Sequence, residues 1–226
     1  MVDVRGVVNQ NTYPTASEGN FIGLRANRRG ELITPDWMTQ LAVDGRVFNI
    51  SHQVQEAGDL CGETAPGSDN INPSILVDVP SGTTIIPLEV LVGVEGTGTA
   101  GDWLIRINTD DAVKYSSGGA ALTPINMAKD DPNTSAVSAY SGSTQIVATA
   151  NTDDDTIWFR RIDQAALGDS GNFSLAHWSA KEFTPPILIG PASLLIFVIV
   201  GNVDNEVLFS VKWAEFTTAE VIQSRT

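Results

Sequence analysis

Apolar and polar residues alternate along much of the chain with the two-residue period of a half-buried β-strand. The pattern is clearest at Trp103–Asn108 and at Glu206–Phe216, where Val207, Phe209, Val211 and Trp213 share one face. The same texture predicts strands at Val47–Val54, Ser74–Val79, Thr84–Val94, Gln145–Thr149, Thr156–Ile162, Asn172–His177 and Leu194–Val200. The last of these is an unbroken apolar run, which predicts burial on both faces.

One segment reads differently. Thr34 followed by Pro35 and Asp36 is a helix-start signal, and Asp44-Gly45 is a stop. We predict a short helix over Pro35–Val43 with Trp37, Met38 and Leu41 turned inward, although these residues also fit strand alternation.

About nine or ten short strands with turn signals between them indicate an all-β fold. Because no second helix is visible, a parallel βαβ sheet is disfavoured. We predict an antiparallel β-sandwich of jelly-roll type with at most one short helix, the alternative being an immunoglobulin-like sandwich. Its expected core comprises Trp103, Ile105, Ile107, Trp158, Phe197, Ile199, Phe209, Val211 and Trp213.

Residues 1–30 lack apolar periodicity and are predicted to form an extended N-terminal arm before a β-sandwich body at 31–226. Charge separates the two ends of the chain: residues 1–50 are neutral overall, and the remainder carries the whole net charge of −14. The arm contains Arg25, Arg28 and Arg29, whose guanidinium groups can each fork onto a carboxylate. These three arginines are the predicted partner-binding residues, although they could instead pair with acids of their own body.

Composition excludes several classes of protein. With 42% hydrophobic and 18% charged residues, the chain is not disordered as a whole. Its acidity disfavours both nucleic acid and anionic membranes as partners. A single cysteine, Cys61, forms no disulfide within the chain, and the N-terminus has no signal-peptide pattern.

Possible catalytic motifs lack their required surroundings. Gly96–Gly101 spells G-x-G-x-x-G but precedes a strand, whereas a dinucleotide site needs a helix there. Gly168–Gly171 resembles a serine-protease nucleophile loop, yet His52 lies within a predicted strand. His52 and His177 have no metal-ligand spacing. We therefore predict no enzyme activity, no cofactor and no metal.

Two weaker alternatives stay open. The acidic turns Asp110-Asp111, Asp130-Asp131 and Asp153–Asp155 could bind Ca²⁺ if two of them converge. The five tryptophans could line a sugar-binding platform, although three of them alternate with aliphatic residues as core residues do.

Three phrases of the chain resemble tailed-bacteriophage virion proteins. They are Gly23–Trp37 continuing at Asp44–Phe48, Pro80–Val90, and the closing Val211–Phe216, which together make up about a sixth of the chain. The resemblance implies a jelly-roll structural protein of a phage particle, of the head decoration or cement kind. It transfers no site residue.

The expected function is therefore a non-enzymatic virion structural protein on the capsid surface, binding the major capsid protein. The apolar excess of Ile187–Val200, together with the resemblance, predicts a homotrimer. The alternative is a tail, fibre or carbohydrate-binding sandwich module that reads a host glycan. Exposed Trp or Tyr gathered on one face would favour the glycan reading, and core tryptophans with an ordered arm would favour the cement protein.

Overall fold

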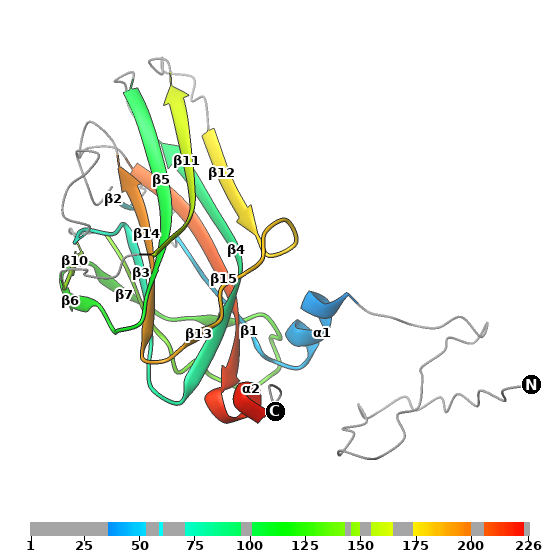
Figure 1. Cartoon of the computed structure of the whole chain (residues 1–226). Helices are drawn as coiled ribbons and strands as arrows, with labels where there is room; N and C mark the ends of the chain where they lie inside the picture. Colours follow the sequence, from blue (N-terminus) through cyan, green and yellow to red (C-terminus); the bar gives the residue numbers. More distant parts are fainter. Residues whose placement is uncertain are drawn as a thin grey trace, which may run out of the picture. The chain divides into compact units, whose positions relative to one another are not determined.

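The structure is a computed structural model that describes residues 36–52, 59–60, 71–95, 101–142, 146–149, 155–164, 174–199 and 206–223. Contacts divide the chain into two units, Met1–Gln40 and Leu41–Thr226. The second unit consists of antiparallel strands (Figure 1). The all-β class is therefore confirmed.

A seven-stranded sheet forms one layer of this unit. Its path is β12 (Ser174–Ser179), β4 (Thr83–Glu95), β15 (Glu206–Thr217), β1 (Val47–Ser51) and β8 (Ile125–Asn126), with β13 (Leu188–Ile189) added to β4 and β2 (Asp59–Leu60) to β15. A six-stranded sheet forms the second, in the order β11 (Asp155–Gln164), β5 (Gly101–Asp110), β14 (Ala192–Ile199), β3 (Ile75–Val79), β9 (Ser138–Ser141) and β7 (Ala120–Leu122). A small sheet pairs β10 (Val147–Ala148) with β6 (Tyr115–Ser117).

The eight principal strands pair in a nested order. Along the chain they run β1, β3, β4, β5, β11, β12, β14 and β15, and the first pairs with the last, β3 with β14, β4 with β12, and β5 with β11. Successive strands such as β3 and β4 lie in different sheets. Most ladders are therefore closed by residues far apart in sequence.

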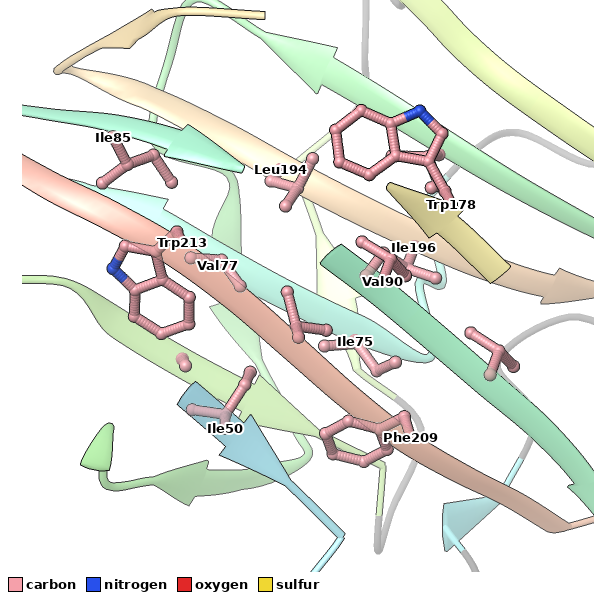
Figure 2. Packing of buried hydrophobic residues seen from close by; sticks show 14 of the residues in the cluster. Ile50, Ile75, Val77, Ile85, Val90, Trp178, Leu194, Ile196, Phe209 and Trp213 are labelled. Atoms are coloured by element: carbon pink, nitrogen blue, oxygen red, sulfur yellow. The ribbon is translucent and has the colours of Figure 1, made fainter. Parts of the chain in front are cut away.

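Both sheets contribute to one hydrophobic core (Figure 2). Trp213 and Phe209 come from β15 and Trp178 from β12, while Ile75 comes from β3 and Ile196 from β14. Of the predicted core residues, all are buried except Trp158, which is half-buried against the cluster.

β14 is buried along its whole length, as the unbroken apolar run predicted. Leu194, Ile196 and Val198 enter the main core, while Leu195, Phe197 and Ile199 join a second cluster on the other face of the sheet. Leu76, Ile146 and Ala148 complete that second cluster. Most of the apolar run that suggested a homotrimer is thus buried within one chain, whereas Ile187 stays exposed.

β4 continues through Pro87, although proline has no N–H for the ladder. The register shifts here, with Lys212 opposite Glu89 and Trp213 opposite Pro87, so that Leu88 is an extra residue on β4. The carbonyl of Leu88 instead accepts a hydrogen bond from Ala180 at 2.8 Å. The bulge therefore accommodates the proline inside a long central strand.

The first helix, α1, spans Trp37–Val43 and ends at the predicted stop. Gly45 has φ +69°, and the amide of Arg46 donates to Leu41 while that of Gly45 donates to Ala42, which is a Schellman ending. The prediction that Trp37 turns inward is wrong: α1 has no buried residue, and Trp37 is 45% exposed.

The prediction of at most one helix is also wrong, because α2 covers Thr218–Gln223. Its start is a capping box, in which the Glu220 carboxylate accepts hydrogen bonds from the Thr217 amide at 2.9 Å and the Thr217 hydroxyl at 3.0 Å. Neither helix in the described part of the chain is long and apolar enough to cross a membrane.

Candidate functional site

The predicted partner-binding residues Arg25, Arg28 and Arg29 lie outside the described residues, and so do Cys61 and Gly168–Gly171. Their roles stay predictions. The G-x-G-x-x-G segment is partly outside as well, but β5 begins at its last glycine, Gly101. A strand therefore follows this motif, where a dinucleotide site would need the N-terminus of a helix.

His177 belongs to a polar ladder across three strands. Its Nε2 lies 3.2 Å from Oε1 of Glu89 on β4, and Oε2 of Glu89 accepts a hydrogen bond from Nζ of Lys212 on β15. Burial alone would raise the pKa of Glu89, but the hydrogen bonds and charges of Lys212 and His177 outweigh it and lower the pKa. The ladder stabilises the sheet through cross-strand charge pairs.

His52 follows β1, and its ring lies edge-on to Phe209 with the centroids 6.2 Å apart. Its backbone amide donates to the Phe209 carbonyl. The two histidines thus occupy separate surroundings. Over the described ranges, no three His, Cys, Asp or Glu side chains gather as metal ligands.

The tryptophans are mostly core residues. Trp103, Trp178 and Trp213 are buried, whereas Trp158 is half-buried. Tyr115 and Tyr140 stack on each other and close the second hydrophobic cluster. The described part of the chain therefore brings no three exposed Trp or Tyr side chains together as a sugar-binding platform would require.

Asp78 is the centre of a buried polar network. Its carboxylate accepts hydrogen bonds from the amides of Lys114 at 3.1 Å and Tyr115 at 3.0 Å, and from the hydroxyl of Ser193 at 2.6 Å. Nearby, Nζ of Lys114 forms an ion pair with Oδ2 of Asp110 at 3.0 Å. These groups attach the segment after β5 to the six-stranded sheet, which is a structural use of buried charge.

An open cleft of about 360 Å³ lies beside α2. Arg46 crosses it and binds Glu220 with both guanidinium nitrogens, at 3.1 and 2.7 Å, while its guanidinium lies 5.2 Å from the centroid of Phe216. The hydrogen bond from Arg46 is the largest cause that lowers the pKa of Glu220 to about 2. This pair fastens α2 to the start of β1, and Thr217-x-x-Glu220 is the sequence signal that could have revealed it.

A mixed aromatic and cationic strip runs across the outer strands of the six-stranded sheet. Arg106 of β5 stands between Phe197 of β14 and Phe159 of β11 in the register, and its guanidinium lies 4.9 Å from the Phe197 centroid. Phe197 is fully buried, but Phe159 is 68% exposed. Arg161, two residues further along β11, shares the face of Phe159.

A second cavity of about 360 Å³ has an acidic rim. Two of the predicted acidic turns meet here, because Asp155 at the start of β11 pairs with Thr109 just before Asp110 and Asp111. The remaining lining is apolar: Ile187, Leu188, Ile189 and Ala192. Asp111 and Asp155 are exposed, whereas Leu188 and Ala192 are buried. Sequence reasoning anticipated that acidic turns could converge but not the apolar floor between them.

The carboxylates of the polar network, the polar ladder and the clefts form hydrogen bonds or ion pairs within the chain. They are Asp78, Asp110, Glu89, Glu215 and Glu220. Comparison with known proteins finds no matching family model, no similar curated protein and no similar solved structure.

Proposed function

We propose that this chain is a non-enzymatic virion structural protein of jelly-roll type that binds and stabilises a phage capsid as a decoration or cement protein. It would lie on the capsid surface as a homotrimer, bound to the major capsid protein. Arg25, Arg28 and Arg29 of the arm would anchor it to carboxylates of that partner.

The pairing order of the eight principal strands is the observation that carries the proposal. A jelly roll is a long hairpin folded over on itself, and its strands pair first with last, second with seventh, third with sixth and fourth with fifth. The ladders β1–β15, β3–β14, β4–β12 and β5–β11 follow this order. Viral capsid proteins are among the proteins built on this fold.

The fold alone does not choose between a capsid protein, a lectin and a cupin enzyme, since all three use jelly rolls. The choice rests on the side chains. Three buried tryptophans and an internally satisfied polar network favour a structural role over a glycan platform. The phrases Pro80–Val90 and Val211–Phe216, which resemble phage virion proteins, lie on β4 and β15 at the centre of the seven-stranded sheet.

The decisive experiment is to count the protein in purified phage particles by quantitative mass spectrometry against the major capsid protein. We expect copies in the hundreds per head, removed together with the heads when tails are separated. A few copies per particle, remaining with the tails, would support the tail or fibre module instead. Absence from the particles would contradict both forms of the proposal.

A further inference from the structure

We propose that copies of this chain associate through one repeated contact, in which Phe159 of one copy enters the acid-rimmed cavity of the next. Arg161 of the first copy then meets the carboxylates of Asp111 and Asp155 on the second. The inference deepens the trimer of the proposed function, but neither the contact nor its test requires a capsid.

Phe159 is the projecting side of the contact. At 68% it is the most exposed of the large hydrophobic side chains in the described part of the chain, and it lies in the middle of a ten-residue strand. Its register neighbour is Arg106, whose guanidinium lies over Phe197. An aromatic ring flanked by arginine is the composition typical of the energetic centre of a protein interface.

The cavity is the receiving side. Its volume of about 360 Å³ exceeds the roughly 150 Å³ apolar cavity that can hold a benzene ring. Leu188 and Ala192 supply a buried apolar floor, and Ile187 stands half-exposed at the edge. A phenyl ring placed here would exclude water from the floor, which is favourable in proportion to the apolar area covered.

Charge selects the occupant. A chain of net charge −14 repels its own copies, so a contact where unlike charges meet favours association. Arg161 stands beside Phe159, and exposed Asp111 and Asp155 stand on the cavity rim. A second copy therefore carries the apolar floor and the carboxylates that this aromatic and cationic strip complements.

One copy cannot fill its own cavity with its own Phe159. Asp155 on the rim and Phe159 belong to the same strand, and four residues of strand separate them by roughly 13 Å. The projecting and receiving surfaces are thus different patches of one molecule. A contact of this kind is head-to-tail, and it closes into a ring when the rotation between copies permits.

Strand-to-strand pairing is a poor alternative for this edge. In the described residues β11 pairs with β5 alone, but a bulge interrupts it between Thr156 and Trp158. Bulges and charged side chains such as Arg160 and Arg161 are features that block edge pairing. Contact through side chains is the mode of association that remains compatible with both features.

The first test measures self-association of the full chain by sedimentation equilibrium from ~1 to ~100 µM, which corresponds to binding free energies of about −8 to −5 kcal/mol. We expect the wild type to associate. Phe159→Ala should raise the dissociation constant by about 30-fold or more. Arg161→Asp should do the same. Arg160→Asp is the matched control, because it makes the same charge change on the opposite face of β11 and should leave association unchanged.

The second test exchanges the charges. Asp155→Arg and Arg161→Asp should each be monomeric alone, and an equimolar mixture should associate because the intact strip of the first variant meets the intact rim of the second. The double variant Asp155→Arg/Arg161→Asp should associate by itself. Both substituted positions are exposed, so the variants should stay folded, and unfolding curves of the single and double variants check this.

A wild type that stays monomeric throughout this range would overturn the inference. Self-association of Phe159→Ala as strong as that of the wild type would also overturn the inference, but it would leave the proposed trimer intact. Failure of the charge exchange to restore association would show that the rim and the strip do not meet. None of these results depends on where the protein lies in a phage particle.

Discussion

At the scale of single residues, several polar side chains described by the structure connect one element of the fold to another. Glu220 begins α2 through its capping bonds and simultaneously receives both nitrogens of Arg46 from the start of β1. Asp78 gathers three donors from two different segments. In both cases a carboxylate joins a short peripheral element to a long strand, so charge stabilises the fold where apolar burial is small.

We expect Glu220→Gln to lower the free energy of unfolding by ~0.5–1 kcal/mol at pH 7, a small value because the side chain is substantially exposed. The native pKa of Glu220 is about 2, below the unfolded value of about 4.3. The carboxylate's contribution to stability is therefore complete above about pH 4.3 and is lost as the pH falls toward 2. Denaturation curves at pH 7, 4 and 2 measure this, with Glu182→Gln as an exposed control. A difference that persists unchanged at pH 2 would contradict the assignment.

Asp78→Asn tests the buried network. The asparagine amide would present an N–H₂ group to donors, leaving at least one of them without an acceptor, and we expect a loss of ~2–3 kcal/mol. Urea unfolding of the variant measures it. The exposed Asp130→Asn, which makes the same chemical change, should shift stability by less than about 0.5 kcal/mol. Equal effects for both variants would show that the network carries no particular weight.

At the scale of elements, β14 is the strand on which the core depends. It lies between β5 and β3 in the six-stranded sheet, and its alternate residues enter two different hydrophobic clusters, as those of its shorter neighbour β3 also do. Its apolar run therefore reflects burial on both faces. A strand at the edge, such as β11, needs apolar residues on fewer positions and leaves Phe159 exposed.

Shortening a buried side chain on either face of β14 should therefore lower the free energy of unfolding substantially. We expect Ile196→Ala and Leu195→Ala each to reduce the free energy of unfolding by ~2–5 kcal/mol, because each leaves a cavity in a fully buried site. Ile125→Ala on the short edge strand β8 should cost less than about 1 kcal/mol. If Leu195→Ala proved as mild as Ile125→Ala in denaturant titrations, the second cluster would not be a core.

At the scale of the whole molecule, the core assembles from residues at Val47 and beyond, and its first strand pairs with its last. Folding and partner binding are therefore expected to be separable.

Deletion of residues 1–30 should leave a cooperatively folded protein with an unchanged far-ultraviolet circular dichroism signal of β-structure, and should weaken binding to capsids. The full-length variant Arg25→Ala/Arg28→Ala/Arg29→Ala should bind more weakly than wild type and lose part of the salt dependence, because charge pairs are screened by salt. Co-sedimentation with particles at low and high salt measures both. Binding of the truncated chain as tight as that of the whole would exclude the arm as the anchor.

Side-chain periodicity was the most informative part of the sequence. Strand alternation is a local property, and it correctly predicted the long strands, the two-sided burial of Leu194–Ile199 and nearly all of the expected core. Trp158 was expected in that core but is half-buried, because β11 is an edge strand. The Thr217-x-x-Glu220 signal for α2 was present in the sequence and was missed, since the strand pattern of Glu206–Phe216 runs directly into it.

The sequence by itself determined which segments are strands and which of their faces are apolar, because these follow from the chemistry of neighbouring residues. Only the tertiary structure decided which strand pairs with which, since β1 and β15 are held together by residues more than 150 positions apart. It also decided that Ile146 and Ala148 cover the second face of β14, that Asp155 meets Asp110 and Asp111 around an apolar floor, and that Phe159 stays exposed. Each of these depends on contacts between distant segments, and hydrophobic periodicity carries no information about the partner that a buried face will meet.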